Sequence, residues 1–463
     1  MALRTADDYR QSLRDDRILW FRGDRVPDIT AHPQLRVAVD HAAIDYEMPE
    51  PWKDADLGEE ISRYFALPRN GDDLLARSRL IEATTAAGGT MVTLIHEIGT
   101  DAMFALHRVC SRLGGDYLDR VRAYWRHCAV GDLAMAVAQT DVKGDRSKGA
   151  VDQPDAYVRV VDRSDEGIVV RGAKVHTSVS ANANEMIVLP TRAMRAGDED
   201  YAVAFAVPLD APGLSMIVSG WNESSKHARE KPLSSKHKML ETLTVFDDVF
   251  VPWDRVFLCG EVASAGPLAL TFVEYHRFTA LSYKLPLLDA LVGCAFAIAK
   301  ANGIAGAGHV RDKATWLITY AETVRALTEM AAQRYRVGEL DIAYPDPMTT
   351  NIAKFTFANH YHEALERVTD LAGGLLVTSP SGEDWDNPEL RPVLDRFLFG
   401  AEPAEDRMKL MYLIADLVAS DFAGYHAVLA VHAEGSIEAE KLQILRSYDA
   451  TAAEAYARRL AGL

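Results

Sequence analysis

The chain has 463 residues, 48% hydrophobic and 25% charged, a composition that excludes a disordered, collagen-like or low-complexity protein. Its 50 basic and 67 acidic residues give a net charge of −17, which argues against nucleic acid or an anionic membrane surface as the main partner. Four scattered cysteines, the absence of a signal peptide and the lack of an apolar stretch of membrane-spanning length predict a reduced, cytoplasmic protein with no metal site.

Hydrophobic spacing predicts an N-terminal helical domain over residues 1–131. Apolar residues recur at helical intervals over 72–87 and 91–113, and a third helix is expected over 116–130. Glycines follow the second and third of these segments and mark their ends.

The sequence pattern changes over residues 132–262, where short runs of β-branched residues alternate with turn residues and predict a central β domain. Residues 157–161 and 168–170 flank a Ser-Asp-Glu-Gly turn, which predicts a β-hairpin. Regularly spaced strands of this kind favour a central β-barrel or sandwich.

Residues 263–463 are helical again, in long amphipathic segments joined by short breaks, which predicts a C-terminal helical bundle. The fold class is therefore α+β, mostly α, in the order helices, β domain, bundle. The expected helices cover roughly 267–302, 308–338, 347–377, 386–399, 403–432 and 436–462.

The first chemically unusual run leaves an apolar strand and gathers two acids, two bases and a glycine. Backbone N–H groups of such a turn, together with basic side chains, suit an anionic ligand. The alternative is a solvated loop with internal ion pairs. The candidate ligand-binding residues are Gln139, Thr140, Asp141, Lys143 and Arg146.

The second run passes from a strand into small hydroxyl residues, which pack closely against a flat ligand and offer hydrogen bonds. His176 and Ser178 are its candidates. A serine- and threonine-rich strand end explains the run at least as well, and a single histidine is more often structural than catalytic.

The third run places His276, Arg277, Tyr283 and Lys284 in an otherwise apolar helix, with His276 and Tyr283 on one face. Buried titratable groups need partners and favour functional sites. The alternative is that the two basic residues lie at an interface or on the surface.

The fourth run, Gly373-Gly374 near a helix end, permits close approach of a diphosphate, although an ordinary glycine cap explains it equally well.

Taken in order, these runs resemble the flavin family of 4-hydroxyphenylacetate 3-hydroxylase and 4-hydroxybutyryl-CoA dehydratase, which has the acyl-CoA dehydrogenase fold. Residues 140–146, 165–174, 246–252 and 420–426 carry the likeness. The resemblance implies FAD between the β domain and the bundle, and a homotetramer in which a neighbouring subunit completes the site. It assigns flavin contacts to Gln139, Thr140, Asp141, Lys143, Arg146, Ser178, Lys284, Gly373 and Gly374.

The dehydratase branch holds an iron–sulfur cluster on a Cys-x3-Cys and a His-x6-Cys pair. Here these positions fall on Thr93 and Glu97, and on His276 and Tyr283. Glu and Tyr oxygens do not replace soft thiolates, so no iron–sulfur cluster is expected. A dehydratase tyrosine falls on Ala280, and a late glutamate falls near Leu429.

The hydroxylase branch grips a phenol with an Arg-x3-Tyr pair and a histidine. These positions fall near Ile98, Ala102 and Val137, so that set is missing too.

The favoured function is an FAD-dependent monooxygenase that takes reduced flavin from a separate reductase and acts on a small organic substrate. Two alternatives stay open: a cluster-free FAD-dependent dehydratase, isomerase or dehydrogenase acting on an acyl thioester, and a catalytically inactive flavin-binding protein. The candidate catalytic residues are His276, His176, Tyr283, Glu97 and Arg277.

Overall fold

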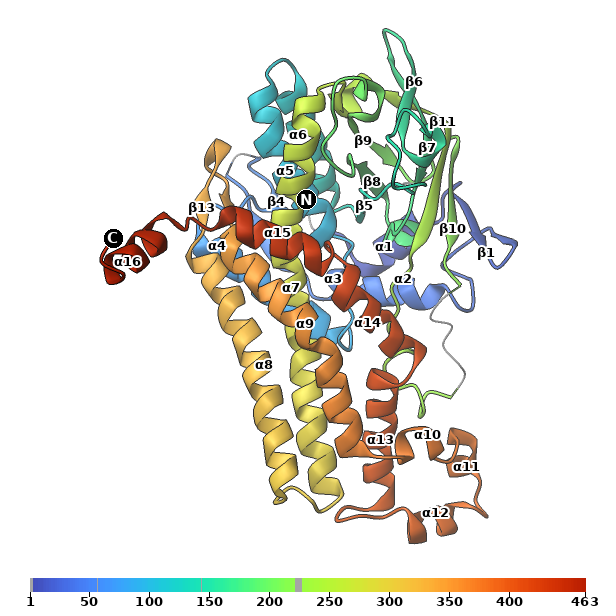
Figure 1. The fold of residues 1–463 in the computed structure, drawn as a ribbon. Coiled ribbons are helices and arrows are strands. Elements are labelled where there is room, and N and C mark those ends of the chain that lie inside the picture. Colours follow the sequence, from blue (N-terminus) through green and yellow to red (C-terminus); the bar gives the residue numbers. More distant parts are fainter. Residues whose placement is uncertain (1–2, 56, 143, 221–226) are drawn as a thin grey trace.

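The computed structural model describes residues 3–55, 57–142, 144–220 and 227–463, so the predicted ligand residue Lys143 lies outside the described part. Figure 1 shows helices at the N-terminal end, two β-sheets beside them, and a long bundle that ends in the C-terminal helices. This order confirms the α+β architecture, with helices predominating. The domain boundaries themselves stay predictions.

The three predicted N-terminal helices agree with α4, α5 and α6 except where α5 begins, and the short helices α1 to α3 were not predicted individually. The hydrophobic pattern starts at Met91, but the helix starts at Glu97, because Thr90 and Leu94 have positive φ angles that an α-helix does not allow. Thr93 and His96 consequently lie in a buried loop before the helix. The helices are α1 (Ala6–Ser12), α2 (Arg36–Ala42), α3 (Ile44–Glu47), α4 (Gly71–Ala87), α5 (Glu97–Leu113) and α6 (Tyr117–Gly131).

Two main sheets form the β region. One has the strand order β2-β1-β10-β11-β7-β6 and the other β12-β9-β8-β5. β1 pairs in parallel with β10, so the first sheet takes two strands from the N-terminal segment. The strands are β1 (Ile18–Phe21), β2 (Asp24–Val26), β5 (Met135–Ala138), β6 (Arg159–Arg163), β7 (Gly167–Lys174), β8 (Glu185–Val188), β9 (Val203–Pro208), β10 (Leu214–Val218), β11 (Thr242–Pro252) and β12 (Val256–Cys259).

Both sheets end in free edges, so the described strands form no closed barrel, and the predicted barrel or sandwich is not confirmed in that detail. The predicted hairpin is confirmed, because β6 and β7 pair antiparallel around the Ser-Asp-Glu-Gly turn. Two further small sheets pair β3 (Pro51–Lys53) with β4 (Glu60–Ser62), and β13 (Arg336–Val337) with β14 (Ala343–Tyr344).

The bundle is built around α7, which packs against α5 and α4 on one side and against α8 and α9 on the other. Breaks near 419 and 449 divide the last two predicted helices into four. The helices are α7 (Val262–Ala301), α8 (Gly308–Gln333), α9 (Pro347–Ala372), α10 (Leu375–Thr378), α11 (Gly382–Asp386), α12 (Arg391–Phe397), α13 (Ala404–Val418), α14 (Asp421–His432), α15 (Ile437–Ser447) and α16 (Thr451–Leu460).

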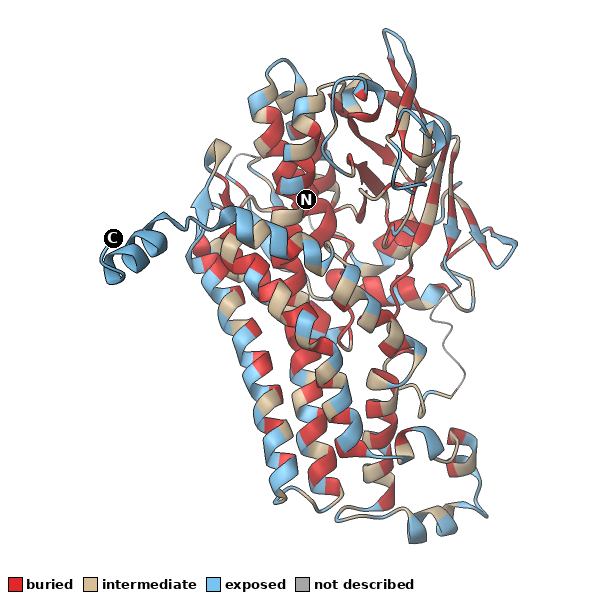
Figure 2. Ribbon diagram, viewed as in Figure 1, coloured by how far each residue is buried: buried red, intermediate tan, exposed pale blue. Residues whose placement is uncertain are grey.

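One apolar core joins the three regions, and Figure 2 shows its buried residues running from the sheets through α5 and down α7. By length and composition α7 is apolar enough to cross a membrane, as is the bent pair formed by Ala404–Val418 and Asp421–Ser447. Two thirds (67%) of the most apolar part of α7 is buried inside the protein, as in the core helix of a bundle.

Candidate active site

A buried Asp–His pair joins the first helical region to the bundle. Asp101 lies on α5 and His276 on α7, and these helices pack side by side. His276 Nδ1 lies 3.0 Å from Asp101 Oδ2, and the imidazole stacks on Phe272. An aspartate at Nδ1 fixes the orientation of the imidazole, so Nε2 is the atom left for proton transfer.

The other oxygen of Asp101 is held by two further donors. Arg77 Nη2 donates to Oδ1 at 2.9 Å, and Thr279 Oγ1 donates to the same atom at 2.9 Å. All three partners of Asp101 are buried. The carboxylate is therefore fully engaged, and its charge is opposed by the Arg77 guanidinium.

A second buried cluster lies further along α7. Tyr283 Oη donates to Glu434, and Lys284 Nζ lies 2.8 Å from the other oxygen of that carboxylate. Burial alone would raise the pKa of Glu434, but the charges of Lys284, Lys354 and His276 outweigh burial and lower the pKa to about 2. Burial lowers the pKa of Lys284 to about 8 against the opposing effect of Glu434.

Tyr283 is held as a neutral phenol, since burial and the neighbouring Glu434 raise its pKa well above the ordinary value. In the sequence, the position of the dehydratase's late glutamate falls near Leu429, which is not an acid. The structure instead brings Glu434 to Tyr283 and Lys284, through a residue with φ of 57° in the loop before α15. A glutamate followed by glycine in a helix break was the available signal.

Arg277 faces this loop. Its Nε donates to the Glu434 carbonyl at 2.9 Å, and its Nη1 donates to Asn351 of α9. Fully buried Lys354 also lies 3.6 Å from Glu434 and 3.5 Å from Glu440. Arg277 thus holds the loop that carries Glu434, while its role as a catalytic residue stays a prediction.

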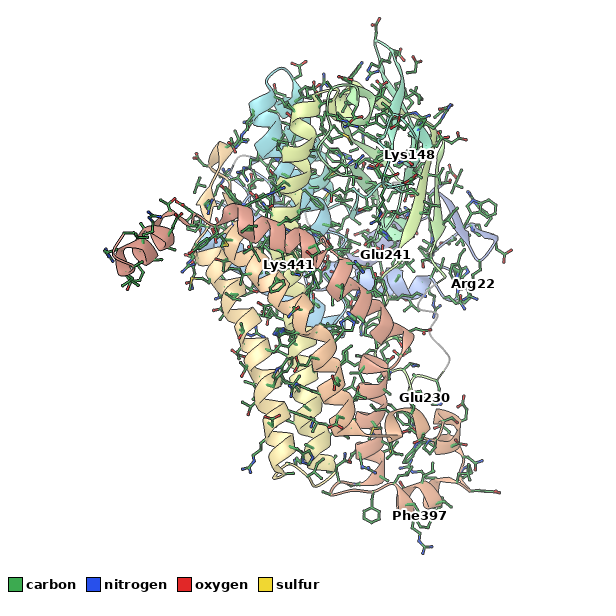
Figure 3. The ribbon with its side chains drawn as sticks, viewed as in Figure 1. Arg22, Lys148, Glu230, Glu241, Phe397 and Lys441 are labelled. Atoms are coloured by element: carbon green, nitrogen blue, oxygen red, sulfur yellow. The ribbon has the colours of Figure 1, made fainter. Side chains whose placement is uncertain are left out.

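A third group joins the β region to the bundle. Ser178 Oγ donates to Glu241 at 2.8 Å, and Tyr425 Oη of α14 donates to the same carboxylate at 2.6 Å. Glu241 lies between the sheets and the C-terminal helices (Figure 3). Burial raises its pKa, although both hydroxyl donors act against this shift. Neither Glu241 nor Tyr425 was singled out by sequence.

The polar run after β5 divides into a buried part and an exposed part. Asp141 is buried and accepts from Lys174 Nζ at 2.8 Å and from the Val158 amide at 3.0 Å. It therefore ties strands together. Gln139 and Thr140 are half-buried, whereas Arg146 is exposed.

The remaining predicted residues lie on the surface of the chain. His176 is exposed and has a φ of 57°, and Gly373 and Gly374 are exposed at the end of α9. A Cβ added at either glycine meets no atom within 4 Å, so this edge is open to a ligand or a neighbouring subunit.

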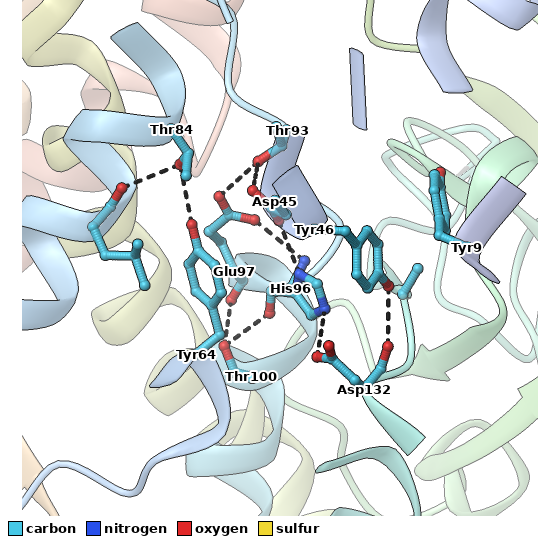
Figure 4. A network of polar contacts seen from close by, with 12 residues as sticks. Tyr9, Asp45, Tyr46, Tyr64, Thr84, Thr93, His96, Glu97, Thr100 and Asp132 are labelled. Atoms are coloured by element: carbon cyan, nitrogen blue, oxygen red, sulfur yellow. Dashed lines mark hydrogen bonds and ion pairs between the residues drawn. The ribbon is translucent and has the colours of Figure 1, made fainter. Parts of the chain in front are cut away.

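A fourth polar network joins Glu97, the first residue of α5, to the loop that precedes this helix (Figure 4). Thr93 Oγ1 lies 2.7 Å from Asp45 Oδ1 and 3.0 Å from Glu97 Oε1. His96 sits between two carboxylates, with Nδ1 2.9 Å from Asp45 and Nε2 3.3 Å from Asp132. Burial opposes the charge of His96, but the nearby carboxylates of Asp132 and Asp45 outweigh burial and raise its pKa to about 10.

Among the described residues, no group of three or more His, Cys, Asp or Glu side chains is arranged to hold a metal ion. Each of the four cysteines is a free thiol, and burial raises the pKa of Cys110 to about 12 and that of Cys294 to about 11.

The sequence patterns of the 4-hydroxyphenylacetate 3-hydroxylase family account for nearly the whole chain. The N-terminal pattern matches residues 5–258 and the C-terminal pattern matches residues 265–462. The resemblance seen in the sequence motifs is confirmed.

Two curated relatives represent both branches of that resemblance. The chain is 31% identical to 4-hydroxybutyryl-CoA dehydratase/vinylacetyl-CoA-Delta-isomerase of Clostridium aminobutyricum, with 100% of both chains covered. It is also 31% identical to the 4-hydroxyphenylacetate 3-monooxygenase oxygenase component of Thermus thermophilus, over 90% of this chain and 89% of the relative.

Solved structures give the same two similarities. An oxygen-tolerant 4-hydroxybutyryl-CoA dehydratase from N. maritimus superposes with a TM-score of 0.93 at 29% identity, covering 100% of this chain and 95% of the other. The oxygenase component HpaB of 4-hydroxyphenylacetate 3-monooxygenase, complexed with FAD, gives 0.90 at 27% identity, with 99% and 98% covered.

Proposed function

Because the chain belongs to the 4-hydroxyphenylacetate 3-hydroxylase family, we propose that it is an FAD-dependent monooxygenase that receives reduced flavin from a separate reductase. Its substrate is a small organic molecule with an ionisable group. The observation that carries this proposal is the buried Asp101–His276 pair, a proton acceptor of fixed orientation between the helical regions.

His276 acts as the general base. With Nδ1 held by Asp101, Nε2 takes a proton from the substrate hydroxyl, and the developing imidazolium is stabilised by the aspartate. Arg77 and Thr279 keep Asp101 in place during this step. Removing a phenolic proton makes the ring electron-rich and ready to accept oxygen.

Tyr283 and Lys284 form a second buried group around the Glu434 carboxylate. Glu434 keeps Lys284 charged in a buried site, and the neutral Tyr283 hydroxyl donates to the same carboxylate. Glu434 thus holds both side chains in fixed positions in the interior of the bundle.

The residues at the edge of the β region fit FAD. Arg146, Arg192 and Arg195 are exposed near the loop after β5, and such guanidinium groups suit a diphosphate. The Ser178 hydroxyl donates its hydrogen bond to Glu241, so its oxygen lone pairs can accept a hydrogen bond from a ligand N–H. When bound there, FAD would supply the electrons for activation of oxygen, which no side chain provides.

The open edge at Gly373 and Gly374 suits the flavin of a neighbouring subunit, so the proposal includes a homotetramer. The proposal also includes a cytoplasmic location, where a separate flavin reductase supplies the cofactor.

The proposal excludes an iron–sulfur cluster. The two positions that align with the cysteine pair of the dehydratase are Thr93 and Glu97, and both are occupied by hydrogen bonds to protein groups. Tyr283 is committed to Glu434. Oxygen ligands of this kind are a poor match for iron in a sulfide cluster.

The ultraviolet–visible spectrum of the purified protein, before and after anaerobic reduction, tests the cofactor assignment. The proposal expects flavin bands that bleach on reduction and no broad iron–sulfur absorbance. A protein that binds no flavin, or that shows the broad band, contradicts it.

A second candidate is a cluster-free dehydratase or isomerase acting on an acyl thioester. The full-length similarity to the dehydratase favours it. Anaerobic turnover of a hydroxyacyl or crotonyl thioester supports this alternative, whereas strict dependence on oxygen removes it.

A further inference from the structure

The Thr93 hydroxyl lies between two buried carboxyl groups and has a single proton to share with them. Its Oγ1 lies within hydrogen-bond distance of two carboxyl groups, Asp45 at 2.7 Å and Glu97 at 3.0 Å. A hydroxyl has one proton to donate, so one of these contacts is a hydrogen bond only if the carboxyl group donates to the Thr93 oxygen. Two full hydrogen bonds at Thr93 therefore need a proton on one of the two acids.

The surrounding charges decide which acid keeps the proton. Asp45 Oδ2 lies 2.9 Å from the His96 imidazole, and the Thr93–Asp45 contact is the shorter one, as expected for an ionised acceptor. The carboxyl group of Glu97 contacts the Thr93 hydroxyl and, at 3.2 Å, the His96 amide, and no ion pair among the described residues joins it to a cationic side chain. His96 and Arg77 lower the pKa of Glu97 through their charges, but neither bonds its carboxyl group through a side chain.

The other cation nearby is already engaged. Arg77 gives Glu97 only a bond to its backbone carbonyl, at 3.0 Å, and places the same nitrogen on the Asp101 carboxylate. Glu97 is fully buried, and desolvation of its carboxylate comes first among the causes that raise its pKa to about 8, followed by the charge of Asp45. The titratable or charged groups around it are Asp45, Tyr64, Arg77, His96, Asp101 and Asp132.

We propose that Glu97 is a neutral carboxylic acid in the resting protein, which donates its proton to Thr93 and acts as a positioning residue for the Asp101–His276 pair. Glu97 and Asp101 lie one turn apart on α5, and Arg77 bridges the two. Losing the Glu97 proton adds a buried negative charge beside Asp101 and changes the field at His276.

Infrared spectroscopy of the holoenzyme labelled with carbon-13 glutamate tests the protonation directly. A labelled carboxylic-acid band is expected at about pH 7, and it should fade as the pH rises through about 8. Glu97→Gln should remove the band, whereas the exposed matched control Glu366→Gln should leave it unchanged. A band that survives Glu97→Gln, or no band at neutral pH, overturns the proposal.

A second pair of variants keeps the test decisive if Glu97→Gln does not fold. Asp45→Asn removes the neighbouring charge, so the midpoint of the band should move to lower pH by on the order of 1 unit. Thr93→Val should shift the band because the acceptor is lost, while Thr93→Ser should retain it. An unmoved midpoint in Asp45→Asn and an unmoved band in Thr93→Val contradict the assignment.

The link to His276 rests on the proposed function and has a separate readout. The pH dependence of turnover should contain a step near pH 8 that Glu97→Gln abolishes. If the infrared band behaves as stated but no turnover occurs, the proposed function fails and the protonation of Glu97 stands. A turnover step that persists in Glu97→Gln refutes the positioning role.

Discussion

At the residue scale, several buried charged side chains lie on α5, on α7 and in the loop before α15. The carboxylates of Asp101 and Glu434 have cationic partners, and the proposed neutral acid Glu97 does not. A buried carboxylate is tolerated when it is paired and hydrogen-bonded, and a buried acid without a partner keeps its proton. The predictions at this scale follow from that difference.

Asp101→Asn removes the negative charge that stabilises the His276 imidazolium and allows the imidazole to adopt its other tautomer. The expected result is a loss of about 100-fold in kcat/KM, the lower range for general base catalysis. Steady-state kinetics over pH checks it. Thr279→Val removes one hydrogen bond to Asp101 and no charge, so it is the milder control. Equal activity in Asp101→Asn and the wild type contradicts the assigned base.

His96→Gln leaves Asp45 and Asp132 as buried carboxylates without their shared cation. The free energy of unfolding should fall by roughly 3–5 kcal/mol near neutral pH. Because the folded pKa of His96 is raised to about 10, its contribution is full below about pH 6.5 and is lost as the pH rises through about 10. Urea unfolding of both proteins across this range measures the difference, which should narrow toward high pH. A constant difference refutes the charge assignment.

At the element scale, the loop between α14 and α15 positions Glu434 against α7. Gly435 has φ of 109°, and a Cβ added there lies 2.5 Å from the Arg277 guanidinium. This explains how a short break late in the bundle reaches Tyr283 and Lys284, which lie about 150 residues earlier. The loop belongs to the site as much as the helix does.

Gly435→Ala should push Arg277 away and disturb the Glu434 loop, with a loss of about 1–3 kcal/mol in unfolding free energy and reduced turnover. Gly114→Ala is the matched control, since its φ is 74° but no atom lies within 4 Å of the added Cβ. Thermal unfolding and kinetics of the two variants separate backbone strain from the clash. If both variants lose the same stability and neither loses activity, the loop has no such role.

The elements themselves were largely predictable from hydrophobic period and turn residues, as α4, α6 and the hairpin of β6 and β7 show. The start of α5 was not, because a buried loop with positive φ at Leu94 carries the same apolar residues as a helix would. The partners of His276 and Lys284 were also beyond a single sequence, since Asp101 and Glu434 reach them across more than 140 residues. Long-range pairs leave no local pattern.

At the scale of the whole molecule, the last helix buries none of its residues against the described part of the chain. Every residue of α16 is exposed, and the helix extends away from the bundle (Figure 2). An isolated helix of 10 residues is marginal in water. Its exposed apolar residues, with Leu445 and Tyr448 before it, suit an interface between subunits.

A chain truncated after Ser447 should therefore form smaller assemblies than the full chain, which the proposed function takes to be a tetramer. Light scattering coupled to size-exclusion chromatography measures the two masses. The point control Glu366→Gln lies on exposed α9 surface and should leave the mass unchanged. A truncated protein with the subunit number of the full chain contradicts a role for α16 in assembly.

The central claim is that this chain uses reduced FAD to place one atom of molecular oxygen on a small substrate, with His276 as the base. Its most direct test is mass spectrometry of products formed from a panel of phenols under oxygen-18 gas, with reduced FAD supplied by a flavin reductase. The account predicts one labelled oxygen atom in the product, lost or strongly reduced in His276→Asn. Product that carries no label, or that forms equally well without oxygen, contradicts it.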